Sequence, residues 1–215
     1  MHMDSQGSYL RNPEFLQIQD QIEGVLYGCN QLWYPSYWQR LSGCGPSTAS
    51  NLVLYFQRKG IIKERVPVTD KTSFIGLMEQ IWQFITPAAG GVHLLSQFYL
   101  GFSHYLESIG SSLSYKALEI PKKKELRPTL EQVVGFIEDA LAQDSPVAFL
   151  NLSRGTLKNL DEWHWVTIVG LRKEEASLRW FATIYDANKT WEIDISQWYE
   201  TNKRGGGLIS YLASE

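Results

Sequence analysis

The sequence predicts an α+β fold with an antiparallel β-sheet, and two features of its 215 residues lead to this prediction. Apolar residues at helical spacing dominate the chain up to Pro146, whereas short apolar runs separated by turn residues dominate the part that follows. Helices first and strands later are typical of folds in which helices are segregated from an antiparallel sheet. With 44% hydrophobic and 13% aromatic residues, the chain can build a substantial core.

Four helices are expected before Pro146, at residues 46–59, 73–85 and 91–108 and from 129 onward. Pro46 suits the first turn of the first helix, because its missing N–H costs nothing there, and Gly60 is a typical helix stop. Thr129 and Gln132 have the spacing of a capping box that opens the fourth helix. The aromatic-rich residues 31–43 are expected to form a loop.

After Pro146 we expect strands at residues 147–152, 164–171, 178–186, 190–195 and 207–212, with a short helix at 196–202. His164 opens the second of these strands and Asp186 ends the third. The turn between them would lie within residues 172–177, so the two strands should form a hairpin.

The length fits a single domain over residues 1–215, with an N-terminal extension at 1–29 and a helical insert at 73–110. The net charge of −3 comes without a basic stripe, so we expect no nucleic-acid partner. No apolar stretch approaches the roughly 18 residues that a membrane span needs, and no signal peptide is visible. We therefore expect no membrane partner and a cytoplasmic location with free thiols. The sequence carries no signal for the oligomeric state.

Cys44 has unusual surroundings for a cysteine, because it lies between two glycines at the entrance of the first helix. Unpaired N–H groups at a helix start stabilise anions, and a thiolate is an anion. The same amides could stabilise an oxyanion. A small buried residue at the start of a core helix is the structural alternative. Cys29 has no such context and is expected to be structural.

His164 favours the catalytic interpretation of Cys44. A cysteine at a helix start followed much later by a histidine that opens a strand is the order that papain-like enzymes use. The base needs only to reach the sulfur in space, so the sequence distance is no obstacle. The alternative is a core histidine that is satisfied by hydrogen bonds.

The segments Gly43–Ala49, His164–Gly170 and Ile184–Asp186 together resemble the papain-like cysteine peptidases. The most similar branch is that of the bacteriocin-leader, or double-glycine, peptidases and their stand-alone relatives, over roughly residues 30–212. The resemblance implies a papain-like fold, with a helical N-terminal half that carries the nucleophile at a helix start and an antiparallel sheet in the C-terminal half. It implies no metal or organic cofactor.

The same resemblance implies a role for each site residue. Cys44 would be the nucleophile, His164 the general base and Asp186 the acid that orients the histidine. Gln39 would add an oxyanion donor, although it lies nearer to the cysteine than is usual in the family, which leaves Gln31 or Asn30 as alternatives. Papain has Cys-Gly-Ser/Ala-Cys-Trp/Tyr around its nucleophile, and the segment around Cys44 departs from that pattern.

Strand register gives an independent argument for Asp186. If the hairpin turn is centred near residues 174 and 175, Asp186 lies directly opposite His164, within reach of a carboxylate–imidazole hydrogen bond. A bulge that shifts the register by one residue would turn Asp186 to the other face, and Asn188 would then be the best replacement. The structural alternative is that Asp186 merely starts the turn that follows it.

These residues predict a thiol hydrolase that cleaves a peptide or isopeptide bond of a peptide or protein substrate. Cys44 would attack the carbonyl, His164 would move the proton, and water would release the acyl group. The same three residues could pass the acyl group to an amine, so a transferase stays open. A catalytically silent module that binds peptides in a protease-like cleft is the alternative from another class of protein.

Overall fold

The computed structural model describes residues 7–63 and 67–213, so the first six residues of the predicted extension lie outside the described residues. The strands are β1 Gly7–Tyr9, β2 Gln17–Asp20, β3 Gly24–Tyr27, β4 Leu113–Ile120, β5 Val147–Asn151, β6 His164–Glu174, β7 Arg179–Asp186, β8 Lys189–Asp194 and β9 Gly206–Ala213. The α-helices are α1 Tyr37–Ser42, α2 Cys44–Arg58, α3 Lys71–Trp82, α4 Leu95–Ser108, α5 Leu130–Ala142 and α6 Ile195–Thr201. Short 3₁₀ turns lie at η1 Pro13–Leu16, η2 Gln31–Trp33 and η3 Lys124–Leu126.

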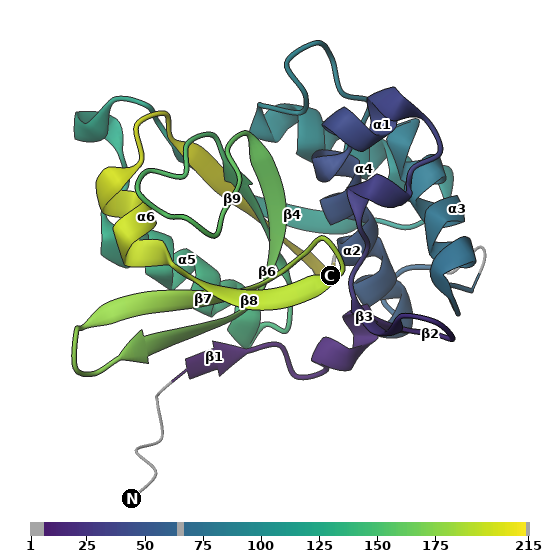
Figure 1. The fold of residues 1–215 in the computed structure, drawn as a ribbon, viewed down its shortest axis with the longest axis horizontal. Helices are drawn as coiled ribbons and strands as arrows, with labels where there is room; N and C mark the ends of the chain where they lie inside the picture. The colour runs from purple at the N-terminus through teal and green to yellow at the C-terminus, as the bar shows by residue number, and fades with distance from the viewer. Residues whose placement is uncertain (1–6, 64–66, 214–215) are drawn as a thin grey trace, which may run out of the picture.

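One antiparallel sheet dominates the C-terminal half and confirms the predicted fold class. Its strand order is β4-β9-β5-β6-β7-β8, and β1 pairs with the far part of β6. Strands β2 and β3 form a separate two-stranded sheet. Helices α1 to α4 gather on one side of the molecule, whereas α5 and α6 lie with the sheet (Figure 1). None of the described helices is long and apolar enough to cross a membrane.

Helix α2 lies between the helical part and the sheet, and it packs against both β6 and α3. Every residue from Cys44 to Gln57 is buried, including several polar ones. The Asn51 side chain explains how such a helix is held, because its amide donates to Thr167 Oγ1 on β6 at 3.0 Å. Its carbonyl oxygen accepts the backbone N–H of Cys29 at 2.9 Å. Buried polar groups need such partners, and these two bonds orient α2 relative to β6.

Several elements differ from the sequence-based expectations. Residues 37–42 form helix α1 rather than a loop, and Ser36 and Gln39 cap it reciprocally. Strand β4 was missed, because most of its side chains face solvent and no apolar run marks it. Helix α4 begins at Leu95 rather than at 91, so residues 83–94 form a loop between α3 and α4. The Thr129–Gln132 capping box of α5 is confirmed.

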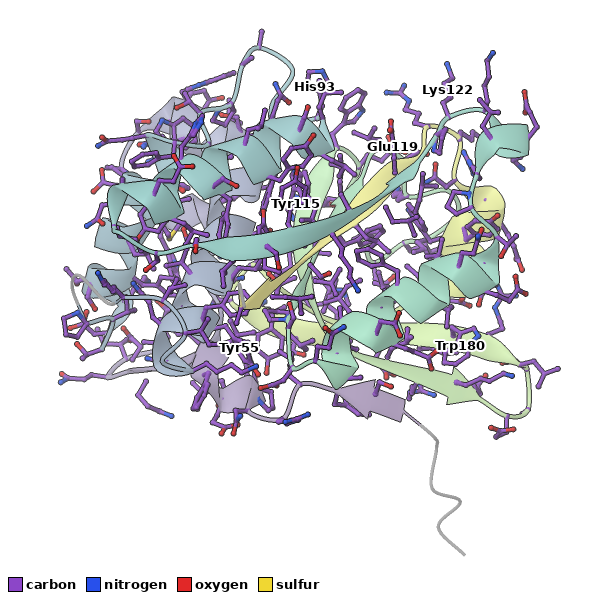
Figure 2. The ribbon with its side chains drawn as sticks, turned by 180° about the vertical axis from the view of Figure 1, so that it is seen from behind. Tyr55, His93, Tyr115, Glu119, Lys122 and Trp180 are labelled. Atoms are coloured by element: carbon purple, nitrogen blue, oxygen red, sulfur yellow. The ribbon has the colours of Figure 1, made fainter. Side chains whose placement is uncertain are left out.

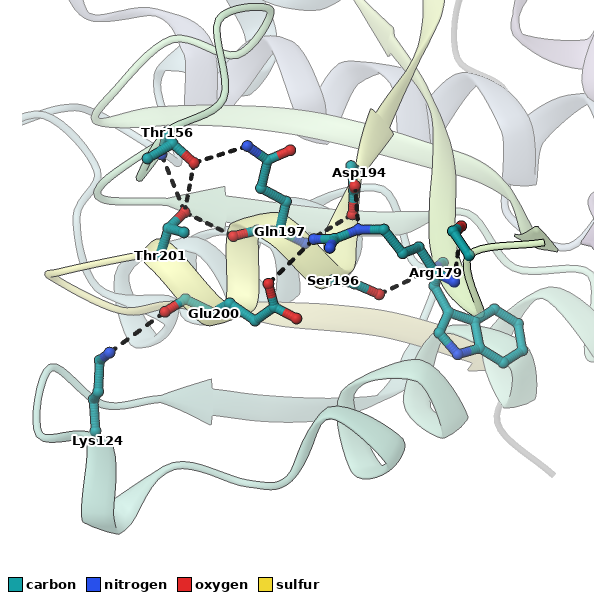
Figure 3. Close-up of polar contacts among 10 residues, drawn as sticks. Lys124, Thr156, Arg179, Asp194, Ser196, Gln197, Glu200 and Thr201 are labelled. Carbon is teal, nitrogen blue, oxygen red and sulfur yellow. Dashed lines mark hydrogen bonds and ion pairs between the residues drawn. The ribbon is translucent and has the colours of Figure 1, made fainter. Parts of the chain in front are cut away.

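Helix α6 is held by a network of side chains (Figure 3). Asp194 caps the helix by accepting the N–H of Gln197 at 2.7 Å, and its other oxygen accepts from Arg179 at 2.6 Å. At the far end, the Thr201 hydroxyl accepts the N–H of Thr156 at 3.0 Å. The loop that follows α6 therefore starts from an anchored helix.

Candidate active site

Cys44 is the first residue of helix α2, and Gly43 alone separates it from the end of α1. A Cβ atom on Gly43 would lie 2.5 Å from the carbonyl oxygen of Gln39 and 2.6 Å from the Tyr34 ring, so the tight junction requires glycine. The Cys44 side chain is nearly buried, with 9% exposure, and its sulfur lies 3.9 Å from the carbonyl oxygen of Trp163. The helix start directs the positive end of the helix dipole at this sulfur.

His164 opens strand β6 and meets Asp186 at the end of β7. The distance between His164 Nε2 and Asp186 Oδ2 is 2.9 Å. A carboxylate only accepts hydrogen bonds, so Nε2–H is the donor, and Nδ1 is the ring nitrogen left for the sulfur. The structure thus brings together three of the predicted site residues, Cys44, His164 and Asp186.

The charge state of His164 follows from its neighbours. Burial of the ring lowers the pKa, but the hydrogen bond with Asp186 and the contact with Cys44 outweigh it and raise the pKa of His164 to about 10. The ring is therefore an imidazolium at neutral pH. A cation in this position favours the thiolate form of a neighbouring cysteine.

The contact between His164 and Asp186 is confirmed, but the predicted register was wrong. Thr167 faces Tyr185, which places Asp186 opposite Val166 and diagonal to His164. The hairpin turn begins after Glu174 rather than at 172, and a bulge lies between Ile168 and Gly170. The displacement is two residues, so Asp186 keeps the face that His164 occupies.

Asn188 does not replace Asp186 as the partner of His164. Its backbone has a positive φ of 55°, which fits the tight turn between β7 and β8. Its side-chain oxygen accepts from the Asn30 amide at 2.9 Å, and its N–H donates to the Cys29 carbonyl at 3.2 Å. Asn188 thus anchors the N-terminal segment to this turn.

Each of the three side chains considered as oxyanion donors makes a hydrogen bond elsewhere. The Gln39 side-chain oxygen accepts the Ser36 N–H at 3.2 Å, at the opposite end of α1 from Cys44. The Gln31 amide donates to the Arg40 carbonyl at 2.9 Å, and the Asn30 amide donates to Asn188. No hydrogen bond joins these side chains to the Cys44 sulfur within the described residues. The oxyanion donors that the fold offers are the backbone amides at the start of α2.

A cavity of about 360 Å³ opens beside Cys44. It is lined by Trp38, Leu41, Ser42, Cys44, Ala89, Gly90, Gly91, Val92, His93, Leu150, Leu152 and Trp163. Most of this wall is apolar. From the aromatic-rich segment at residues 31–43, Trp38 is the aromatic side chain that lines the cavity.

The loop at residues 83–94, which is part of the segment predicted as a helical insert at 73–110, supplies one wall of the cavity. Its Val92 carbonyl accepts the indole N–H of Trp165 at 2.6 Å, next to His164 on β6. A Cβ atom on Gly45 would lie 2.9 Å from Val92 Cβ, so this glycine lets the loop approach the start of α2. The segment between α3 and α4 is therefore attached to both elements that carry the site.

Trp163 is a second feature that sequence reasoning missed. It adopts a positive φ of 54°, which is unusual for a large side chain, and it leaves 47% of its surface exposed at the cavity. The Arg204 guanidinium lies 5.2 Å from the centre of its ring. Its place directly before His164 in the sequence was the signal that could have marked Trp163 as a residue of the site.

Comparisons with known proteins bear on the fold alone. No known family model and no curated protein matches this sequence. Among solved structures, the chain is similar to UfSP from C.elegans, with a TM-score of 0.55 and 11% sequence identity. The match covers 100% of this chain and 36% of the UfSP chain, so the chain spans about a third of that structure. The likeness and the antiparallel sheet together identify a papain-like fold.

Proposed function

We propose that this chain is a thiol hydrolase that cleaves a peptide or isopeptide bond. The observation that carries the proposal is the 2.9 Å contact between His164 and Asp186 beside a cysteine that starts a helix. Three separate elements supply these side chains, and the apolar cavity opens at the sulfur. The similarity of the fold to that of a cysteine protease supports the same class of reaction.

In the proposed mechanism, the Cys44 thiolate attacks the substrate carbonyl carbon, and amides at the start of α2 stabilise the oxyanion. His164 then gives the proton on Nδ1 to the leaving amine, which departs and leaves a thioester. The neutral ring next takes a proton from water as that water attacks the thioester. The C–S bond breaks, and the acid product leaves with the thiolate restored. Asp186 keeps the ring oriented throughout.

Finer assignments remain predictions. These are the bacteriocin-leader branch of the papain-like peptidases, a peptide or protein substrate, the lack of nucleic-acid and membrane partners, and the cytoplasmic location. An acyl transferase would use the same three residues. A silent binding module is less consistent with the geometry, because binding alone needs neither the helix-start sulfur nor the oriented imidazolium.

Substrate trapping would test the proposal. A Cys44→Ala variant should retain proteins or peptides from a cell extract that the wild-type chain releases in cleaved form, as read by mass spectrometry of the new termini. Cys29→Ala is the matched control and should cleave like the wild type. Retention of the same intact molecules by the wild type and Cys44→Ala would instead indicate the binding module.

A further inference from the structure

A second cavity continues the first. It has a volume of about 480 Å³ and shares His93, Leu150 and Leu152 with the cavity beside Cys44. Its other walls come from the start of α4, the end of β4 and the start of β9. Figure 2 shows His93, Glu119 and Lys122 along this edge of the molecule. A single groove therefore runs from the candidate nucleophile across the sheet to the end of β4.

The charges in this second part differ from those of the apolar first part. Lys122 and Arg204 line it together with one acid, Glu119. None of the three forms an ion pair within the described residues. Lys123 and Lys203 are the chain neighbours of the two cations. This excess of positive charge stands out because the whole chain has a net charge of −3.

The two loops that carry these cations are held together by one side chain. Arg127 donates to the carbonyl oxygens of Pro121 at 2.7 Å and of Lys122 and Asn202 at 3.2 Å each. The Asn202 side chain accepts the N–H of Arg204 at 2.8 Å. The backbones at Lys122 and Arg204 are therefore positioned before any ligand arrives, which lowers the entropic cost of binding.

Arg204 also connects the two parts of the groove. Its guanidinium lies over the ring of Trp163, whose carbonyl oxygen lies 3.9 Å from the Cys44 sulfur. A chain segment bound across Trp163 would thus pass from the sulfur to the cationic part.

We propose that the groove between α4 and the end of β4 binds an acidic stretch of the substrate. Lys122 and Arg204 would contact its carboxylates, a few residues to one side of the bond that Cys44 attacks. This inference rests on the proposed function, because it assigns a substrate class to the same site. Unpaired cations at the end of a positioned groove select carboxylates over neutral or basic side chains.

The test uses short peptides that alkylate Cys44 without needing hydrolysis. One series carries a C-terminal chloromethyl ketone and the other an N-terminal chloroacetyl group, so that the peptide extends to opposite sides of the reacting carbon. Each series compares Glu and Asp with Gln and Asn and with Lys at matched positions. In the series whose peptides extend toward Lys122 and Arg204, the Glu and Asp peptides should label Cys44 about tenfold faster than the Gln and Asn peptides at low salt. The preference should shrink at 0.15 M salt, where the Debye length is about 8 Å.

Charge variants test which side chains cause the faster labelling by acidic peptides. Lys122→Glu should abolish or reverse the acidic preference, whereas Glu119→Gln should increase it about twofold. Lys116→Glu is the matched control, because it makes the same change in net charge at a β4 residue that alternates with Ala117 and Glu119, which line the groove, and therefore faces away from it. It should leave the preference intact. Equal labelling by acidic and neutral peptides in both series would overturn the proposal, and so would an equal loss in Lys116→Glu and Lys122→Glu.

A binding measurement separates this inference from the proposed function. Fluorescence anisotropy of acidic and amide peptides on Cys44→Ala needs no reactive sulfur. If neutral probes fail to label Cys44 but acidic peptides bind Cys44→Ala more tightly, the hydrolase proposal fails and the groove proposal holds. If labelling and cleavage proceed without any charge preference, the groove proposal fails alone.

Discussion

Cys29 and Cys44 both lie against the first turn of helix α2, yet their environments are opposite. The Cys44 sulfur starts the helix and faces the His164 imidazolium. The Cys29 sulfur approaches the same turn from the side and donates to the Ser47 carbonyl at 3.1 Å. Exposure hardly distinguishes them, at 9% for Cys44 and 3% for Cys29. The two thiols differ in the groups that they meet, because Cys44 faces a cation and Cys29 faces a carbonyl oxygen.

The protonation of Cys29 follows from its surroundings. A carbonyl oxygen can accept an S–H group but repels a thiolate, so this contact suits the neutral thiol. Burial raises the pKa of the Cys29 thiol far above its usual range. The nearby backbone amide of Cys29 is already used, because it donates to Asn51. Cys29 thus acts as a small packing residue.

The largest expected difference is in alkylation rate. Iodoacetamide at neutral pH should modify Cys44 at least about 100-fold faster than Cys29, because only the thiolate reacts. Peptide mass spectrometry after brief labelling measures both rates in one sample. In denaturant the two rates should become equal. Faster or equal labelling of Cys29 in the folded chain would remove the case for Cys44 as a nucleophile.

Removal of the imidazolium should bring Cys44 closer to the behaviour of Cys29. We expect His164→Ala to slow alkylation of Cys44 at neutral pH about 10-fold to 100-fold, because the thiolate loses its neighbouring cation. The pH dependence of the rate is the measurement. His104→Ala, on the exposed face of α4, is the control and should leave the curve unchanged. An unaltered curve in His164→Ala would make His164 a core residue.

Stability should depend on pH through the same histidine. The pKa of His164 is raised from 6.5 to about 10 in the folded chain, so its stabilising effect is complete below about pH 6.5 and is lost as the pH rises toward 10. The free energy of unfolding by urea should therefore fall between about pH 8.5 and 10, at up to about 1.4 kcal/mol per unit. Below about pH 8.5 the unfolded chain holds on the Cys44 thiol the proton that the folded chain holds on His164, so the two states bind equal numbers of protons. Asp186→Asn should flatten this slope. Parallel pH curves for the wild type and Asp186→Asn would show that Asp186 does not raise the pKa of His164.

The smallest expected effect concerns Gln39. If its side chain caps α1, Gln39→Ala should cost about 0.5–1 kcal/mol of stability and change the labelling and cleavage rates less than about twofold. Ser36→Ala removes the other half of the same capping box and should behave alike. A loss of cleavage in Gln39→Ala, with Ser36→Ala still active, would restore Gln39 as an oxyanion donor.

The sequence predicted the local settings of Cys44 and His164 and the contact with Asp186 better than the elements around them. Cys44 could be found because glycines and Pro46 mark a helix start, and His164 because it opens a strongly apolar strand. The contact with Asp186 was predicted from a register that proved two residues off, and it survived because an even shift preserves the face. The alternation of side chains along a strand thus predicted the sheet face of Asp186 correctly, although its position opposite β6 was two residues off.

Two of the missed elements, α1 and β4, have a common physical cause. Tyr37, Trp38 and Leu41 on α1 are all substantially exposed, so the helix lacks the buried apolar stripe by which helices are recognised. Strand β4 likewise exposes most of its side chains. Both elements border the groove, where side chains face a cavity rather than the core. The spacing of Ser36 and Gln39 was the one signal that could have revealed α1.

The origin of the three site residues has a consequence for the order in which the chain folds. His164 and Asp186 sit on one hairpin and can meet as soon as that local unit closes. Cys44 belongs to a helix made much earlier in the chain, and it reaches the pair only when α2 docks on β6, with Asn51 and Thr167 as the buried link. Because such long-range contacts form late, a newly synthesised or partly unfolded chain carries an ordinary thiol. The reactive sulfur is thus a property of the finished tertiary structure.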